Sequence, residues 1–293
     1  MKDTLPYLIN LPPFMQKDID LDSLNVLKKS LFVIKGKLVG YIVNKTDGKL
    51  FCSLINLLFR ADGKIFYEDG KYYKISKNKD NIYYPNKRIL RSVVDYKSNL
   101  DRLFLTYCLH KVDFDKENVI VDCGSNVGEL SRALKLKNIN FKYFGFEPDK
   151  ETFECLEKNC SDDSVELFNK GLSNIEGVNK FYLDNFGGNS SLVYFGENNF
   201  IEIETSRLDS FNFGKIKLLK IDAEGHEPEV LIGAKNLFEK IEYISIDFGA
   251  ERGTDEEMTI VPVNKMLYDN NFSLVAFSEY RFVGLYKNNK IQE

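Results

Sequence analysis

The stretch that decides the fold is Asn118-Val-Ile-Val-Asp-Cys-Gly-Ser-Asn-Val-Gly128, which Glu129-Leu-Ser-Arg-Ala-Leu134 continues. Its uninterrupted run of β-branched residues is typical of a strand buried on both faces of a parallel sheet. The strand is expected to end at Asp122, where a turn of small residues begins. Apolar residues then recur at helical spacing. A strand, a glycine turn and a helix in this order bring backbone N–H groups up to a ligand, so we predict a binding site at this turn.

A second acidic residue follows at a distance that suits nucleoside recognition. The stretch Phe141-Lys-Tyr-Phe-Gly-Phe146 predicts the next strand, and Glu147 stands at its end, before Pro148. In doubly wound sheets a carboxylate about 20 residues beyond the glycine turn binds ribose hydroxyls. An ionised carboxylate can accept hydrogen bonds from both hydroxyls at once. We therefore expect a nucleoside-like cofactor.

Strands and helices are predicted to alternate along the rest of the chain, which indicates an α/β fold with a parallel sheet. Further core strands are expected at residues 165–168, 216–221 and 241–246, the last two followed by Asp222 and Asp247. Helices are expected at residues 98–110, 150–159, 228–237 and 256–269, and extra strands at 181–186 and 200–204. Residues 272–277 and 281–286 are expected to form a closing antiparallel hairpin.

The glycine turn differs from the fingerprint of a redox dinucleotide site. That fingerprint, G-x-G-x-x-G, needs a second glycine where the pyrophosphate approaches the backbone. Here Asn126 stands two residues after Gly124, so the pattern is D-x-G-x-N-x-G. A carboxylate and an amide beside the turn suit a ligand with an amino-acid head group. The closing hairpin is also unusual for a dehydrogenase sheet, so we expect a cofactor other than a dinucleotide.

The composition limits the classes of partner and location. The chain has 293 residues, 43% of them apolar, which suffices for one large core or a core with a smaller domain. A net charge of −4 gives no electrostatic case for nucleic acid binding. The polar N-terminus suggests no signal sequence, and the longest apolar stretch, 50–59, is too short to span a bilayer. Five cysteines without C-x-x-C spacing are expected to be free buried thiols in a reducing cytoplasm.

Residues 1–97 differ from the remainder and are expected to form a β-rich region. Strands are predicted at 31–34 and 38–43, and a hairpin at 65–75 with the type I′ turn Asp69-Gly70. This region carries no chemical motif, so packing on the core or on a second subunit is the expected role, and a homodimer is possible. A substrate groove is the alternative, lined by Tyr67, Tyr72, Tyr73, Tyr83 and Tyr84.

Four motifs give the chain a resemblance to the class I S-adenosylmethionine-dependent methyltransferases, and among these to the FkbM family. They are Val121-Asp-Cys-Gly-Ser-Asn-Val-Gly128, Gly145-Phe-Glu-Pro148, Thr205-Ser-Arg-Leu-Asp209 and Leu219-Lys-Ile-Asp-Ala-Glu-Gly-His-Glu-Pro-Glu-Val-Leu231, of which the last is the most specific. The resemblance implies a methyltransferase domain over residues 98–293. It also implies a doubly wound, seven-stranded Rossmann-like sheet whose last strand is antiparallel.

The resemblance further implies that S-adenosyl-L-methionine binds over the carboxyl ends of the strands. The residues so implied are Asp122, Gly124, Ser125, Asn126, Gly128, Glu147, Pro148, Lys170, Gly171 and Asp222. The glycine turn would hold the methionine part, Glu147 the ribose, and residues 169–171 would lie near the adenine. His226 and Gly171 depart from the residues that are frequent in the family, and the former could touch the acceptor.

Members of this family commonly methylate hydroxyl groups of sugars and small metabolites. We therefore expect an O-methyltransferase that acts on a sugar, as a sugar nucleotide or an oligosaccharide, in the synthesis of a bacterial surface polysaccharide such as capsule or O-antigen. Methylation of a small secondary metabolite is one alternative. A methyltransferase-like binding module without catalysis is another.

Methyl transfer to an alcohol requires an aligned acceptor and removal of the hydroxyl proton. Asp222, Glu224 and His226 follow one predicted strand, so we expect one of them to be the general base. The alternative for Glu224 and Glu227 is that they cap the next helix. A divalent metal held by Asp222, Glu224 and Asp247 is the less favoured alternative to a metal-free reaction. The loop 189–191 is either a lid or a hairpin turn.

Overall fold

The computed structural model describes residues 12–16, 25–59, 63–76, 81–184, 190–196 and 198–291 of the chain. Two compact units are formed, Met1–Asn99 and Leu100–Glu293, and the helix α4 (Tyr96–Thr106) contains the division. Within the described ranges, no helix is both long enough and apolar enough to cross a membrane. All five cysteines are free and buried, as predicted.

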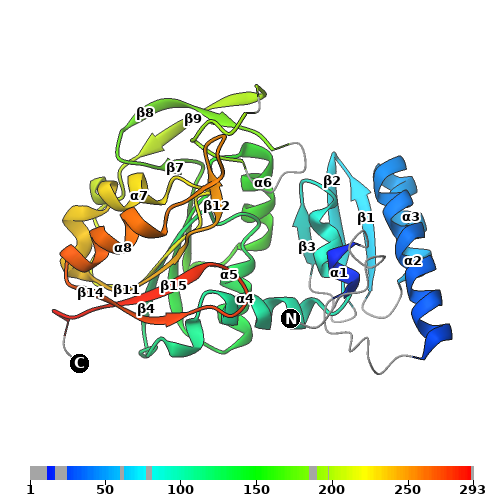
Figure 1. The fold of residues 1–293 in the computed structure, drawn as a ribbon, viewed down its shortest axis with the longest axis horizontal. Coiled ribbons are helices and arrows are strands. Elements are labelled where there is room, and N and C mark those ends of the chain that lie inside the picture. The colour runs from blue at the N-terminus through cyan, green and yellow to red at the C-terminus, as the bar shows by residue number, and fades with distance from the viewer. Residues whose placement is uncertain are drawn as a thin grey trace. The chain divides into compact units, whose positions relative to one another are not determined.

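A seven-stranded sheet forms the centre of the second unit (Figure 1). Its strands are β4 (Asn118–Cys123), β5 (Phe141–Phe146), β6 (Val165–Phe168), β10 (Ile216–Ile221), β11 (Ile241–Asp247), β14 (Phe272–Phe277) and β15 (Val283–Asn288). They are ordered β14-β15-β11-β10-β4-β5-β6. Strand β15 pairs antiparallel with β11 and β14, and the pairs from β11 to β6 are parallel. The predicted Rossmann-like sheet with an antiparallel last strand is confirmed.

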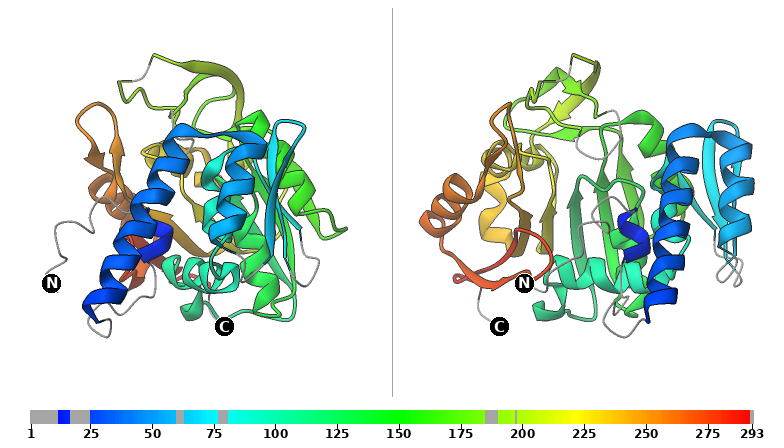
Figure 2. Two further views of the ribbon diagram at one scale, coloured as in Figure 1. Left: turned by 90° about the vertical axis from the view of Figure 1, so that its right-hand side faces the viewer. Right: turned by 45° about the vertical axis from the view of Figure 1, so that its right-hand side comes forward.

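Helices cover both faces of this sheet, which makes it doubly wound. Figures 1 and 2 show α5 (Glu129–Leu136) and α6 (Lys150–Asn159) on one face and α7 (Glu227–Gly233) and α8 (Ile260–Asp269) on the other. Each helix buries an apolar stripe, for example Leu130 and Leu134 of α5. The central strands are buried on both faces, and all six residues of β10 are buried. This arrangement leaves the carboxyl ends of β4, β5, β10 and β11 side by side.

Smaller elements follow the carboxyl ends of the core strands. A three-stranded sheet contains β7 (Gly171–Leu172), β9 (Phe200–Ser206) and β8 (Gly177–Tyr182), and begins three residues after β6. The hairpin of β12 (Ala250–Arg252) and β13 (Glu257–Met258) follows β11. Three short 3-10 helices, η4 (Leu109–Lys111), η5 (Leu208–Ser210) and η6 (Lys235–Lys240), complete the unit.

The first unit combines helices with a small antiparallel sheet. It contains α1 (Pro13–Gln16), α2 (Val26–Lys45), α3 (Gly48–Leu58), β1 (Lys64–Glu68), β2 (Lys71–Ile75), β3 (Asn81–Tyr84) and η3 (Lys87–Ser92). The predicted hairpin is β1–β2, and its turn residues Asp69 and Gly70 have φ angles of 49° and 78°, as a type I′ turn requires. Tyr72 and Tyr84 are buried, so they cannot line a groove, whereas Tyr67 and Tyr73 line an open hollow beside α3.

The strands predicted at 31–34 and 38–43 are wrong, because both stretches belong to the single helix α2. Their β-branched residues favoured strands locally. The side chain of Asn25 caps the helix by accepting the backbone N–H of Lys28 at 2.9 Å. Gly36, Val39 and Ile42 are buried at a spacing of three residues, which is a helical period. Tertiary packing therefore overrode the strand propensity.

Several predicted boundaries in the second unit also need correction. The helix expected at 98–110 ends at Thr106, because Cys108 takes the left-handed conformation. The helix expected at 228–237 ends at Gly233, where a Cβ atom would lie 2.0 Å from the carbonyl oxygen of Ser173. The helix expected at 256–269 begins at Ile260.

Two predicted strands near the site are shifted. The strand expected at 181–186 is β8, which ends at Tyr182, and residues 185 and 186 lie outside the described part. The last strand begins at Val283 rather than at Arg281. Arg281 therefore lies in the turn between β14 and β15, which has consequences for the site.

Candidate cofactor and acceptor site

The turn after β4 requires its two outer glycines. Gly124 and Gly128 have φ angles of 73° and 85°, a region that side chains rarely adopt. A Cβ on Gly124 would lie 2.1 Å from the carbonyl oxygen of Asp222, and one on Gly128 would lie 2.5 Å from Cys160 Sγ. The turn is thus packed between the ends of β10 and α6. Ser125 is buried and its hydroxyl donates to the carbonyl of Asp122 at 2.8 Å, so Ser125 shapes the turn from below.

Glu147 joins the ends of β4 and β5. Its Oε2 accepts the backbone N–H of Asn126 at 2.9 Å, and its Oε1 accepts that of Asp149 at 3.0 Å. The residue is 7% exposed. Burial raises the pKa of its carboxyl to about 7, since the two backbone N–H groups only partly offset the loss of solvent. Each carboxylate oxygen has two lone pairs, so the group retains acceptor capacity for ribose hydroxyls.

A buried lysine supports the turn from beneath. Lys220 Nζ lies 2.9 Å from Asp122 Oδ1 and donates to the carbonyls of Cys123 and Gly124 at 3.1 and 2.7 Å. Asp122 is fully buried and also accepts the hydroxyl of Tyr143. Burial lowers the pKa of Lys220, but the charges of Asp122 and Asp222 outweigh it and the net shift is upward. The structure therefore places Asp122 behind the turn, where it orients the backbone.

The residues expected near the adenine occupy different environments. Asn169 donates its amide to the carbonyls of Glu147 and Pro148 at 2.9 and 3.0 Å, so it fixes the loop after β5. Lys170 instead forms an ion pair with Glu204 at 3.0 Å. Gly171 is buried in β7, and a Cβ there would lie 3.0 Å from Ile203 Cδ1. The geometry thus makes Pro148 and Asn169 neighbours of Glu147, the carboxylate expected to bind ribose, and gives Gly171 a packing role.

A cluster of carboxylates lies at the ends of β10 and β11. Arg281 reaches it from the β14–β15 turn: its Nη1 lies 3.5 Å from Asp222 Oδ2, and its Nη2 lies 2.7 Å from Asp247 Oδ2 and 3.8 Å from Glu251 Oε1. Tyr107 donates its hydroxyl to Asp222 Oδ2. The hydroxyl of Tyr107 and the guanidinium of Arg281 thus both face Asp222. The positive charge of the guanidinium stabilises negative charge on this carboxylate.

The acidic side chains around Asp222 hold protons more tightly than free carboxylic acids. Burial raises the pKa of Glu224, and the charge of Asp222 and a hydrogen bond with Glu251 raise it further. Burial and the charge of Asp222 also raise the pKa of Asp247. The charge of Asp222 in turn raises the pKa of Arg281. Glu224 and Asp247 are therefore protonated more readily than free carboxylic acids, whereas Arg281 remains a cation.

His226 is held by groups inside the protein. Its Nε2 lies 3.0 Å from the hydroxyl oxygen of Ser173, and its Nδ1 lies 3.5 Å from Glu229 Oε2. Burial lowers the pKa of the imidazole to about 4, so the ring is neutral at physiological pH. The geometry therefore favours a structural role for His226.

Glu227 caps the turn that carries the acids. Its Oε1 accepts the backbone N–H groups of Ala223 and Gly225 at 3.1 and 3.0 Å, and its Oε2 accepts the hydroxyl of Thr259 at 3.0 Å. Glu227 is 1% exposed. These contacts hold residues 222–226 in one conformation and tie them to the start of α8. Glu227 is the first residue of α7, and no side chain among the described residues caps that helix, so the structure does not bear out the helix-capping alternative for Glu227 and gives it the role of bracing the preceding turn.

A metal would find ligands in a slightly different set from the one expected. Oxygens of Asp222, Glu224 and Glu251 lie within 4.8 Å of one another, a spacing that suits a divalent cation. Asp247, the third ligand expected from the sequence, is bound by Arg281 instead. Arg281 also approaches Glu251, so the guanidinium already supplies positive charge here. A metal-free reaction stays a prediction.

Other residues singled out in the sequence have structural partners. Arg207 forms a bidentate pair with Asp209 at 2.7 and 2.9 Å and donates to the carbonyl of Asn174 at 3.0 Å, so this motif braces β9 against the turn after β7. Ser191 is 1% exposed and donates to the carbonyl of Glu224 at 2.7 Å, which joins its loop to the acidic turn. Asn189 lies outside the described residues.

The sequence did not reveal three side chains that complete the site. Tyr107 and Arg281 come from elements far from Asp222 in the chain, so local spacing carries no signal for them. Lys220 stands inside the most specific motif, two residues before Asp222. A lysine within a fully buried strand is itself a signal, because an isolated buried charge is costly and must have a partner.

The cofactor fits the residues present. The carboxyl of Glu147 is buried with a raised pKa, so it gains from further hydrogen-bond donors such as ribose hydroxyls. Gly124, Asn126, Pro148 and Asp222 are partly exposed and lie at the ends of adjacent strands. Asp222 carries negative charge at the end of β10, where a sulfonium would gain electrostatically.

Comparisons with known proteins agree with this geometry. A family model described as the methyltransferase FkbM domain matches residues 122–274, more than half of the chain. The chain is similar to the hexuronic acid methyltransferase AglP of Haloferax volcanii, at 28% identity over 142 residues, 46% of this chain and 58% of that protein. It is also similar to methyltransferase sdnD of Sordaria araneosa, at 28% identity over 170 residues, 45% of this chain and 66% of that protein.

Both matches thus span less than two thirds of the relatives' own length. Among solved structures, the chain is similar to a methyltransferase FkbM from Methylobacillus flagellatus, at 18% identity. The TM-score is 0.45, with 63% of this chain and 47% of that chain covered.

Proposed function

The chain belongs to the FkbM methyltransferase family, and from that premise we propose that it transfers a methyl group from S-adenosyl-L-methionine to a hydroxyl of a sugar. The observation that carries the proposal is the bond from the backbone of Asn126 to Glu147, which joins the glycine turn and the ribose-binding position at one edge of the sheet. The acids at the end of the next strand, β10, face the same edge.

The cofactor supplies an electrophilic methyl group on a positively charged sulfur. We assign Glu147 to the two ribose hydroxyls, and the backbone of residues 124–126 to the methionine part. Lys220 and Asp122 hold that backbone in place and have no direct contact with the cofactor in this assignment. Asn169 fixes the loop that follows Glu147 and borders the adenine.

We assign the role of general base to Asp222. A carboxylate oxygen of Asp222 would accept the proton that the acceptor hydroxyl loses when its oxygen takes the methyl group and the bond between methyl carbon and sulfur breaks. Tyr107 and Arg281 support this role because they hold the carboxylate in one orientation, and Asp222 is partly exposed at the end of β10, where an acceptor can reach it. Glu224 fits less well, since its raised pKa keeps it protonated, and His226 fits less well because Ser173 and Glu229 face its two ring nitrogens inside the protein.

The acceptor class follows from the relatives and from one charged group. One relative is named a hexuronic acid methyltransferase, and a hexuronic acid carries a carboxylate. The Arg281 side chain is 43% exposed at the edge of the acidic cluster, so it has surface left for an anionic sugar. A surface polysaccharide precursor is such an acceptor. Five free buried cysteines agree with synthesis in a reducing cytoplasm.

A methyl-transfer screen with radiolabelled cofactor tests the proposal. Hexuronic acids, neutral sugars, their nucleotide-activated forms and small hydroxylated metabolites are offered in parallel. We expect transfer to an anionic sugar, and loss of at least 100-fold in kcat for Asp222→Asn with cofactor affinity kept within about tenfold. Transfer to a hydroxylated metabolite alone would support the second candidate, a small-metabolite methyltransferase. Cofactor binding without transfer to any acceptor would support a non-catalytic module.

A further inference from the structure

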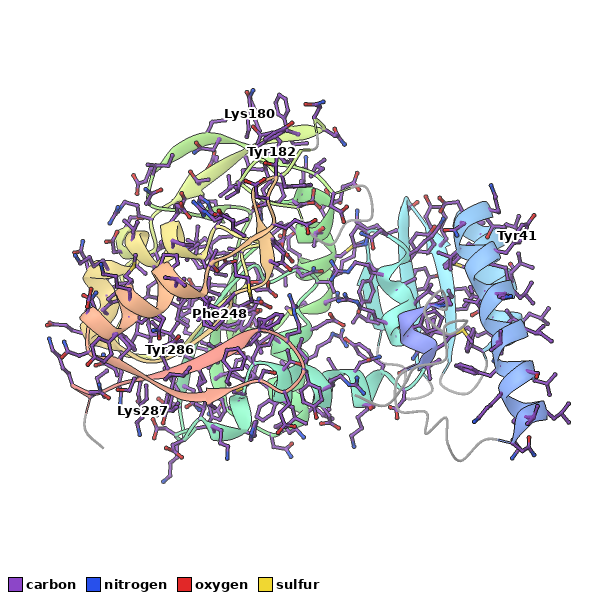
Figure 3. The ribbon with its side chains drawn as sticks, in the orientation of Figure 1. Tyr41, Lys180, Tyr182, Phe248, Tyr286 and Lys287 are labelled. Atoms are coloured by element: carbon purple, nitrogen blue, oxygen red, sulfur yellow. The ribbon has the colours of Figure 1, made fainter. Side chains whose placement is uncertain are left out.

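The helix α2 has two apolar faces, one buried and one exposed. One face carries Gly36, Val39 and Ile42, which are buried within the first unit. The other carries Leu27, Leu31, Ile34, Leu38 and Tyr41, with exposed fractions of 69, 58, 63, 45 and 64%. Successive members are four, three, four and three residues apart, so all five lie on one stripe along the helix. Tyr41 projects away from the small sheet in Figure 3.

Large apolar side chains seldom stay this exposed together. Scattered single residues are normal on a surface, but a continuous stripe marks a site where another surface binds. The stripe runs over four turns of helix and is exposed among the residues that the structure describes. Its length and regularity indicate an extended, flat binding surface.

Lysines flank this stripe. Helix α2 contains five lysines and no acidic residue in the sequence VLKKSLFVIKGKLVGYIVNK. At 100° per residue, Lys37 borders one side of the stripe, whereas Lys28 and Lys35 border the other, and Lys45 extends its end. Lys28, Lys37 and Lys45 are exposed. Lys35 lies over the Phe59 ring at 4.0 Å, so its charge is anchored beside the stripe.

We propose that α2 docks this protein on an anionic lipid surface. An apolar stripe between rows of lysines is the pattern by which a helix lies in a membrane interface, with the stripe among the acyl chains and the lysines at the headgroups. A second copy of the chain fits worse, since pairing two such stripes would place lysines against lysines without an acid in either helix. The lipid surface satisfies both the apolar and the charged features.

The proposal is independent of methyl transfer. It requires neither cofactor nor acceptor, and it concerns the first unit, whereas the proposed active site lies in the second. Docking would affect the reaction only through the position of the enzyme. An enzyme held at a lipid surface meets acceptors that are themselves attached to lipid. The binding test below therefore succeeds or fails separately from the activity screen.

Sedimentation of the full chain with sucrose-loaded vesicles tests the proposal. Vesicles of phosphatidylcholine alone are compared with vesicles that contain 30–40% phosphatidylglycerol, roughly the anionic fraction at which surface potential becomes strong. We expect binding to the anionic vesicles that weakens as salt is raised, because lysine–headgroup attraction is screened. Binding to both vesicle types alike, or to neither, overturns the proposal.

Two variants and a control locate the contact. Leu31→Glu combined with Ile34→Glu should abolish binding, and Lys28→Gln combined with Lys37→Gln should weaken it roughly 25-fold, at about fivefold per lysine. Val178→Glu makes the same kind of change at a 65% exposed valine of the other unit and should leave binding unchanged. Circular dichroism confirms folding of each variant.

Self-association through the stripe would give a different experimental result. A wild-type dimer in light scattering that the Leu31→Glu, Ile34→Glu variant converts to monomer, without vesicle binding by either, would assign the stripe to self-association and overturn the lipid proposal. Equal vesicle binding by the lysine variant and the wild type would overturn it as well, because the charges would then have no part in docking.

Discussion

Gly124 is the residue on which the shape of the cofactor turn depends. Its positive φ angle could be tolerated by another residue at a modest cost, but the carbonyl oxygen of Asp222 lies where a Cβ would stand. The turn and the proposed base are therefore packed directly against each other. A change at Gly124 should disturb cofactor binding and the position of Asp222 together.

We predict that Gly124→Ala lowers the free energy of unfolding by more than about 3 kcal/mol, because the strained φ angle and the clash add. Gly253→Ala is the matched control. Gly253 has the same φ angle of 73°, but no atom lies within 4 Å of its built Cβ. The control should lose only about 1–2 kcal/mol. Equal decreases in the free energy of unfolding of the two variants, measured in urea, would show that the contact with Asp222 does not contribute to stability.

At the scale of elements, the turn between β10 and α7 depends on one buried glutamate. Glu227 accepts two backbone N–H groups and one hydroxyl, and all three donors would lose their partner on its removal. An unsatisfied buried donor costs about 1–3 kcal/mol. The acidic residues at 222 and 224 are carried by this turn, so its rigidity is a condition for catalysis.

Glu227→Ala should therefore lower the free energy of unfolding by about 3–5 kcal/mol and reduce kcat strongly even where the protein remains folded. Glu239→Ala is the control, since the Glu239 side chain is 85% exposed and should change stability by less than about 0.5 kcal/mol. A stable Glu227→Ala protein with unchanged kcat would mean that the capping bonds are dispensable.

Elements of the core sheet could be predicted from sequence because their burial dictates their composition. The strands β4, β10 and β11 are buried on both faces and are rich in apolar residues, and an acid stands at or next to the carboxyl end of each. Helix α2 could not be predicted in this way, because its β-branched residues suggested strands. Its second apolar face, whose residues are largely exposed, obscured the single-sided pattern of an ordinary surface helix.

The site residues also divide into those that could be predicted from the sequence and those that could not. Glu147 and Asp222 were predictable because each directly follows a core strand. Tyr107 and Arg281 were not, since Tyr107 is 115 residues from Asp222 and meets it only through the fold. Gly171 and Lys170 were placed near the adenine by resemblance, whereas packing against Ile203 and pairing with Glu204 are what the structure provides.

For the whole molecule, the proposed cofactor site lies at the edge of the core sheet in the second unit, and its acid Glu147 is buried. Burial raises the pKa of Glu147 to about 7. Ribose hydroxyls donate to the ionised form, so cofactor binding favours loss of the proton. The affinity for the cofactor is therefore expected to rise as the pH increases towards 7 and to become constant above it. Below pH 7 the affinity should fall about tenfold per pH unit.

The most direct measurement is calorimetric titration of the protein with S-adenosylhomocysteine between pH 5.5 and 8.5, for the wild type and Glu147→Gln. We expect the wild type to bind, with an affinity that increases up to pH 7. For the variant we expect an affinity roughly 100-fold weaker at pH 8, since hydrogen bonds to a charged acceptor are lost, and no pH dependence below 7. An absence of binding by the wild type, or equal affinities for the two proteins across this range, would contradict these expectations.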